Sequence, residues 1–157
     1  MFHWTYLWSN FTLTYQILSK KVKDFVLMRA GFLCEYCLSP SAYSIQPFTN
    51  DHITPSSKKG TDDLDNLASA CGGCNGHKYN KTKARDPLTG KIVPLFNPRK
   101  MNWYVHFEWS INYLYVTGIT DIGRATVEAL YLNREGVVNT RYLLLLDKKH
   151  PAFYTFK

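Results

Sequence analysis

Four cysteines in two Cys-x-x-Cys pairs constrain the fold of this chain more than any other sequence feature. The pairs are Cys34/Cys37 and Cys71/Cys74, and they contain every cysteine in the 157 residues. A pair with this spacing can present both sulfurs to one ion, and two pairs complete a tetrahedral site with no open position. The spacing therefore predicts a structural Zn²⁺ site formed by these four thiolates.

Two disulfides and a thioredoxin-like dithiol are the other possible uses of these cysteines. Residues 1–8 are aromatic but lack a basic segment and a small-residue cleavage site, so we expect a cytoplasmic protein with reduced thiols. That compartment disfavours disulfides, and a redox Cys-x-x-Cys motif has no need of a second copy. No stretch approaches the roughly 18 to 20 apolar residues that span a bilayer, so we expect no membrane partner.

The 33 residues from 38 to 70 separate the two pairs, which is longer than the roughly 15 to 20 residues of a simple zinc ribbon. This insertion contains Asp51-His52-Ile53-Thr54-Pro55, in which the proline favours an extended backbone before it. Consecutive residues of a strand point to opposite faces, so Asp51 and His52 cannot share one role. One can hold a cation while the other faces a water molecule, although an isolated Asp-His pair is more often a surface turn.

The net charge of +7 is concentrated around this insertion. Residues 49–100 hold nine Lys/Arg and five Asp/Glu, so four of the seven excess positive charges lie there. This placement favours a polyanionic partner, most simply nucleic acid. The alternative is a general surplus of charge that only keeps the protein soluble.

Local patterns predict a mixture of helices and strands, the α+β class. We expect a helix from Lys20 to Gly31, an extended segment through Asp51, and a second helix from Asn75 to Arg85. In the second helix four residues share one face, because they are spaced three, four and three residues apart: Asn75, Lys78, Thr82 and Arg85. Two simpler readings stay open, namely that Asn75 only caps this helix and that the basic run from 78 to 85 is a solvated face.

The last third of the sequence predicts a β-hairpin followed by two helices. Residues 103–109 alternate with a period of two, and residues 113–118 supply the partner strand. Thr120 can cap one helix, and the other runs from about Arg134 towards Leu146. We therefore divide the chain into an extension of unclear structure at 1–19, a core domain at 20–100, and a hairpin-helix extension at 101–157 packed on the core.

The order of these motifs resembles that of the zinc-containing HNH endonuclease family. The order is Cys34-x-x-Cys37, Asp51-His52-x-x-Pro55, Asn66-Leu67 and Cys71-x-x-Cys74-Asn75-x-x-Lys78, and it covers roughly residues 25–85. The segment 51–55 is similar to the HNH domain of RNA-guided CRISPR effector nucleases. The tail, with Leu95-Phe96-Asn97-Pro98-Arg99 and Gly123-Arg124-Ala125-Thr126-Val127, resembles small stand-alone bacterial HNH proteins, notably cyanobacterial ones.

The resemblance implies both a fold and a reaction. The fold is a ββα-metal core stapled by the four-cysteine zinc site, in which a hairpin bears His52 and a helix bears the last ligand. The reaction is metal-dependent hydrolysis of phosphodiester bonds in DNA, by nicking or by double-strand cleavage. His52 is then the general base that takes a proton from water, and Asp51 and Asn75 hold one divalent cation. Asn66 pins the loop and orients His52.

One departure from the family pattern bears on the catalytic metal. Asn75 stands where many members have a third histidine, and its amide oxygen is a hard ligand that favours Mg²⁺ or Mn²⁺.

Six basic side chains are expected to contact phosphates without reading base sequence: Lys58, Lys59, Lys78, Lys81, Lys83 and Arg85. The alternative functions are a catalytically inactive zinc module that binds nucleic acid or protein, and a redox or metal-handling protein.

Overall fold

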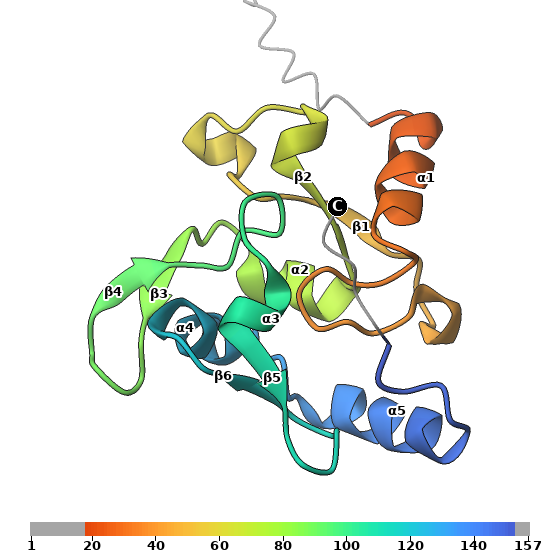
Figure 1. Ribbon diagram of the computed structural model, residues 1–157. Helices are drawn as coiled ribbons and strands as arrows, with labels where there is room; N and C mark the ends of the chain where they lie inside the picture. The colour runs from red at the N-terminus through yellow and green to blue at the C-terminus, as the bar shows by residue number, and fades with distance from the viewer. Residues whose placement is uncertain (1–17, 153–157) are drawn as a thin grey trace, which may run out of the picture.

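Helix α1 (Lys20–Arg29) opens the part of the chain that the computed structural model describes, residues 18–152 (Figure 1). Its first turn is capped by Ser19, whose hydroxyl accepts a hydrogen bond from the Val22 amide at 3.3 Å. Gly31 follows the helix with a φ of 61°, a left-handed conformation that costs glycine little. The predicted first helix is therefore confirmed, while the predicted extension at 1–19 lies almost wholly outside the described residues.

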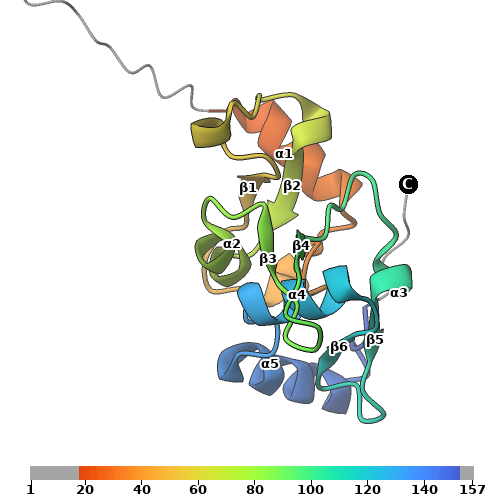
Figure 2. The same cartoon turned by 90° about the vertical axis from the view of Figure 1, so that its left-hand side faces the viewer.

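A β-hairpin followed by a helix occupies the centre of the molecule (Figures 1 and 2). Strand β1 (Thr49–His52) pairs antiparallel with β2 (Leu67–Ala70), and α2 (Gly72–Lys78) follows directly. Helices α1 and α2 both pack on this hairpin. The predicted α+β class with a ββα core is confirmed.

Three short 3₁₀ turns accompany this core. The turn η1 (Ser41–Tyr43) precedes the hairpin, and the loop between its strands carries η2 (Ser56–Lys58) and η3 (Leu64–Asn66). Backbone hydrogen bonds within these turns therefore shape the loop that follows His52.

Helix α2 begins earlier and ends sooner than predicted. The Cys71 sulfur caps it by accepting from the Cys74 amide at 3.5 Å, and it ends before Tyr79, which has a φ of 49°. The predicted helix from 75 to 85 is confirmed for residues 75–78 and wrong beyond them, and Asn75 lies inside α2 rather than at its cap. Residues Lys83–Arg85 form strand β3, paired with β4 (Ile92–Pro94). Basic side chains at 83 and 85 alternate with Ala84, which is the two-residue period of a strand.

The C-terminal segment contains two helices and a hairpin, largely as predicted. Helical turn α3 (Trp103–His106) leads into β5 (Phe107–Trp109), which pairs with β6 (Val116–Gly118). Helices α4 (Asp121–Ala129) and α5 (Glu135–Leu146) follow, and the Thr120 hydroxyl caps α4. Only the first half of the predicted strand 103–109 is wrong. There the Asn102 side chain accepts from the Tyr104 amide at 3.0 Å and starts a helical turn.

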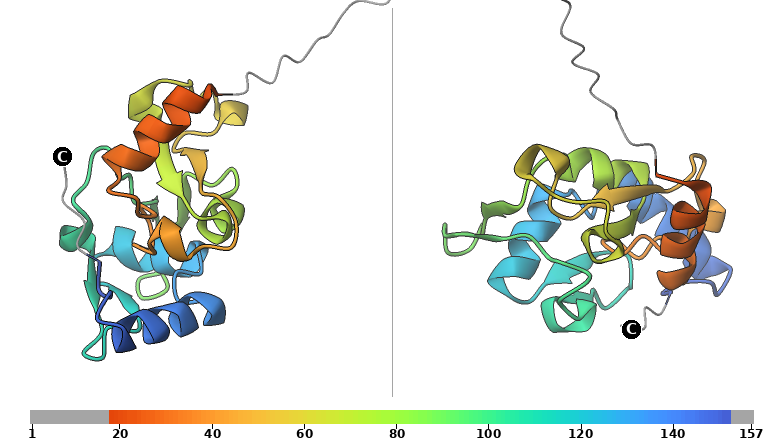
Figure 3. Two further views of the ribbon diagram at one scale, coloured as in Figure 1. Left: turned by 90° about the vertical axis from the view of Figure 1, so that its right-hand side faces the viewer. Right: turned by 90° about the horizontal axis from the view of Figure 1, so that it is seen from above.

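The core joins this segment to the cysteine-bearing loops. Trp103 is fully buried, and its indole N–H donates to the Tyr36 carbonyl at 3.0 Å. Phe107 and Phe96 pack in the same cluster, together with the four cysteines. Figure 3 shows α1 and α5 at opposite ends of the molecule, with the central hairpin and α4 between them.

A buried ion pair ties the β3–β4 turn to α4. Arg124 donates through Nε and Nη2 to the two carboxylate oxygens of Asp86, both at 2.8 Å. This bidentate contact holds the pKa of Asp86 well below its usual range.

None of the helices in the described part of the chain has the length and apolar character that a membrane span requires.

Candidate functional site

The hairpin directs Asp51 into the protein. Its side chain is 3% exposed, Oδ2 accepts from the Tyr36 hydroxyl at 2.6 Å, and Oδ1 accepts from Lys78 Nζ at 3.0 Å. Burial raises the pKa of Asp51 above its ordinary value, and the positive charge of Lys78 offsets part of that rise. Asp51 therefore links strand β1 to the first cysteine loop and to α2.

His52 has a different environment, as its position in the strand requires. About a quarter of the side chain is exposed, and Nε2 lies 2.7 Å from Oδ1 of Asp62. A carboxylate can only accept, so Nε2 carries the proton in the neutral imidazole and Nδ1 is left as the acceptor. The structure thus orients His52 through a residue that the sequence did not single out, because Asp62 is one of several acidic residues in an exposed loop.

Asn66 holds the loop that follows His52. Its Oδ1 accepts from the Thr54 amide at 2.9 Å, and its Nδ2 donates to the carbonyls of Thr54 and Thr61 at 3.0 and 2.8 Å. All of these partners are backbone groups of the loop, so Asn66 acts on His52 through the backbone.

Lys78 is not on the surface. It is 1% exposed, and besides Asp51 its ammonium donates to the His52 carbonyl at 2.8 Å. The structure does not support the prediction that Lys78 contacts phosphate, because the ammonium is buried and donates to two internal acceptors. Lys78 instead joins the end of α2 to the two residues that the sequence placed at the reactive centre.

We expect Lys78→Met to lower the free energy of unfolding by about 3–5 kcal/mol, because it leaves the Asp51 carboxylate buried without its charge partner. The measurement is urea-induced unfolding, monitored by circular dichroism. Lys81→Met is the matched control, since Lys81 is exposed and its ammonium donates to the carbonyl of His77 on the protein surface. Equal stability of the two variants would show that the buried pair contributes nothing.

Asn75 lies one turn before Lys78 on α2. Its side chain is half-buried, and the side-chain amide makes no hydrogen bond to another described residue. The side-chain oxygen Oδ1 is therefore available to a ligand. Asp51 and Asn75 offer one carboxylate and one amide oxygen, which are the donor types that Mg²⁺ and Mn²⁺ prefer. A cation on Asp51 Oδ1 has to compete with the Lys78 ammonium that contacts that oxygen now.

The four cysteines come together as the sequence predicts. Cys34, Cys37, Cys71 and Cys74 are all buried, and their sulfurs lie within 4.8 Å of one another. No two of them form a disulfide. Four thiols gathered from two turns around one point fit a tetrahedral, closed zinc site. Among the described residues they form the only such group of histidine, cysteine and acidic side chains.

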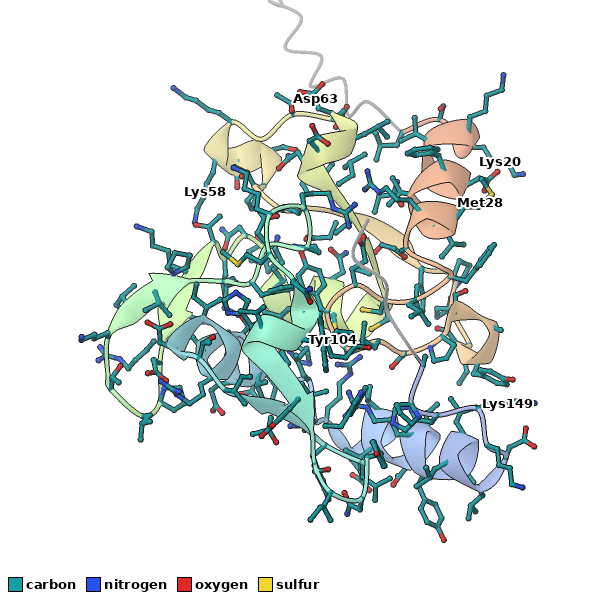
Figure 4. All side chains as sticks on the ribbon, in the orientation of Figure 1. Lys20, Met28, Lys58, Asp63, Tyr104 and Lys149 are labelled. Atoms are coloured by element: carbon teal, nitrogen blue, oxygen red, sulfur yellow. The ribbon has the colours of Figure 1, made fainter. Side chains whose placement is uncertain are left out.

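The other five basic side chains that were predicted to contact phosphate are exposed, and they lie on two neighbouring segments. Lys58 ends the η2 turn and Lys59 follows it. Lys81 precedes β3, and Lys83 and Arg85 are its first and last residues. Lys58 Nζ donates to the Thr82 hydroxyl at 3.4 Å, so the two segments meet. Figure 4 shows Lys58 at that edge of the molecule.

A comparison with family models gives one match. Residues 34–81 match the model described as HNH endonuclease. The matched span begins at Cys34 and includes both cysteine pairs, Asp51, His52 and Asn75. No curated protein and no solved structure matches the chain.

Proposed function

Because residues 34–81 belong to the HNH endonuclease family, a family of nucleases, we propose that this protein is a metal-dependent endonuclease that hydrolyses phosphodiester bonds in DNA. The observation that carries the proposal is the placement of His52. The side chain stands at the end of β1, is partly exposed, and has one ring nitrogen bound to Asp62. The other nitrogen is left to accept a proton.

His52 acts as the general base. An imidazole with one free ring nitrogen is the side chain best suited to take a proton from water near neutral pH. Two backbone restraints fix its position, since Lys78 binds its carbonyl and Asn66 holds the loop that follows. The imidazole is thus held on a rigid element rather than on a mobile loop, which favours a productive approach to the phosphate.

Asp51 and Asn75 hold the catalytic cation, which we propose is Mg²⁺ or Mn²⁺. When bound, this cation stabilises charge on the phosphate and on the departing 3′-oxygen. Tyr36 and Lys78 keep the Asp51 carboxylate oriented, and a cation held by Asp51 would share Oδ1 with the Lys78 ammonium. The exposed residues Lys58, Lys59, Lys81, Lys83 and Arg85 contact the DNA backbone, which gives strong salt dependence and little base specificity.

The test is incubation of zinc-loaded protein with supercoiled plasmid in Mg²⁺ or Mn²⁺. We expect nicked circles that DNA ligase can seal, because departure of the 3′-oxygen leaves a 3′-hydroxyl and a 5′-phosphate. EDTA should protect the plasmid. Nicks that ligase cannot seal would contradict the proposed direction of attack, and cleavage that survives EDTA would contradict the metal requirement.

Asp62→Asn is expected to slow DNA cleavage by roughly tenfold, a part of the 10²–10⁴-fold that a general base contributes. An amide in place of the carboxylate no longer defines which ring nitrogen of His52 is protonated. The measurement is the initial nicking rate at saturating DNA. Asp65→Asn is the matched control, because Asp65 is exposed on the neighbouring η3 turn. A rate for Asp62→Asn equal to that of the control would remove Asp62 from the mechanism.

One observation favours a second candidate function, a catalytically inactive zinc module that binds nucleic acid or protein. Both oxygens of Asp51 already have internal partners, as expected if the Asp51–Lys78 pair is purely structural. The plasmid assay separates the two functions. A binding module retains plasmid in a gel-shift experiment and leaves it supercoiled with every divalent cation.

A further inference from the structure

An arginine from the C-terminal segment reaches the cysteine cluster. Arg134 lies immediately before α5, some sixty residues after the second cysteine pair, and outside the span that matches the family model. Its Nη2 donates to Cys71 Sγ at 3.0 Å, and its Nη1 lies 3.6 Å from Cys74 Sγ. Nη1 also donates to the Tyr131 carbonyl at 3.2 Å, so the guanidinium is fixed on the α4–α5 connection as well.

The charge of a loaded cluster explains why a cation belongs there. Four thiolates around one Zn²⁺ leave a net negative charge of about two, in a site whose ligands are buried. Buried charge is tolerated only when it is paired and hydrogen-bonded. A second arginine supports the same region: Arg141 is 2% exposed and donates to the Cys37 carbonyl at 3.3 Å and the Leu132 carbonyl at 3.0 Å.

The second cysteine loop leaves room for the Arg134 guanidinium. A Cβ added at Gly73 would lie 2.5 Å from Cζ, Nε and Nη2 of Arg134, whereas a Cβ added at Gly72 would meet nothing within 4 Å. Residue 73 therefore has to be glycine for the guanidinium to reach the sulfurs. The neighbouring glycine carries no such requirement, although both lie in the first turn of α2.

We propose that Arg134 is an outer-sphere partner of the structural zinc site, which donates hydrogen bonds to the Cys71 and Cys74 thiolates and slows the loss of zinc. Through this contact the α4–α5 connection becomes part of the metal site. Groups that hydrogen-bond to metal ligands stabilise the ligands' charged form and fix their orientation, and their loss lowers metal affinity by roughly 10–100-fold. The proposal does not depend on catalysis, so it stands or falls apart from the proposed function.

The experiment measures zinc release from the full-length, zinc-loaded protein to a chromophoric chelator. We expect Arg134→Gln to accelerate release by roughly 10–100-fold. Arg134→Lys should release zinc at a rate between those of Arg134→Gln and the wild type, because a lysine keeps the charge but lacks the planar guanidinium that reaches two sulfurs. Purified wild-type protein without bound zinc would overturn the proposal at the first step.

Two glycine variants provide a matched pair that leaves every charge and every ligand in place. Gly73→Ala displaces the Arg134 guanidinium, and the displaced atoms are the end of a flexible side chain, so the helix itself is retained. Gly72→Ala makes the same chemical change in open space. We expect faster zinc release from Gly73→Ala and a wild-type rate from Gly72→Ala. Gly73→Ala combined with Arg134→Gln should release zinc no faster than Arg134→Gln alone.

A spectroscopic signal separates this role from general destabilisation. In Co²⁺-substituted protein the thiolate-to-metal charge-transfer band should shift when the hydrogen bonds to sulfur are lost, with unchanged far-ultraviolet circular dichroism. If Arg134→Gln fails to fold, Gly73→Ala decides the matter. Wild-type release rates and an unshifted band in Gly73→Ala, or equal acceleration by both glycine variants, would overturn the proposal.

Discussion

Cys34→Ser is expected to unfold the protein rather than to slow any reaction. The four sulfurs lie within 4.8 Å of one another inside the core, so removal of one ligand breaks a closed site that several loops share. Zinc binding contributes on the order of 10–16 kcal/mol to the folding of small zinc-finger peptides, which matches or exceeds the roughly 5–15 kcal/mol net stability of a typical domain. We expect loss of the cooperative thermal transition in circular dichroism and loss of bound zinc.

Chelation of the wild-type protein should reproduce this result without any substitution. A strong chelator in mild denaturant is expected to remove the zinc and the cooperative transition together, and added zinc should restore both. A Cys34→Ser protein that is zinc-free, stably folded and active would refute the structural role of the metal.

His52→Ala is expected to reduce DNA cleavage by about 10²–10⁴-fold, because it removes the group that accepts the proton from water. Zinc content, circular dichroism and DNA affinity should match those of the wild type, since the His52 side chain is partly exposed and its ring bonds to Asp62 in an exposed loop. Added imidazole should restore part of the activity. The measurement is the initial nicking rate on supercoiled plasmid.

His77→Ala is the control for this substitution. His77 is exposed on α2, where its ring packs on Tyr131 at a centroid distance of 4.8 Å, and no part of the mechanism uses it. We expect nearly wild-type cleavage from this variant. Equal rates for the two histidine variants would show that His52 has no special role.

The local features of this fold could be predicted from the sequence because their causes are local. Cysteines three positions apart share one turn, and adjacent residues of a strand point to opposite faces, so the cysteine cluster and the different surroundings of Asp51 and His52 followed from spacing. The predicted cap at Thr120 likewise depends on a residue only three positions away.

The features that could not be predicted depend on contacts between distant segments. Lys78 belongs to a basic run that reads as a solvated face, and only the approach of α2 to β1 directs it to Asp51. Arg134 and Arg141 contact the cysteine loops from a distant part of the chain, and no sequence motif links either arginine to the cysteines. The length of α2 was mispredicted because Arg85 continues the helical spacing of Asn75, Lys78 and Thr82, whereas Lys83 and Arg85 also fit the two-residue period of a strand.

The most direct test of the central claim compares folded, zinc-loaded wild-type protein with His52→Ala on one supercoiled plasmid, across several divalent cations and at equal occupancy of the DNA. The account predicts that both proteins bind the plasmid and that only the wild type nicks it, with Mg²⁺ or Mn²⁺ and not with EDTA. A wild-type protein that binds the plasmid yet cleaves it with none of the cations would contradict the account, as would cleavage by His52→Ala at the wild-type rate.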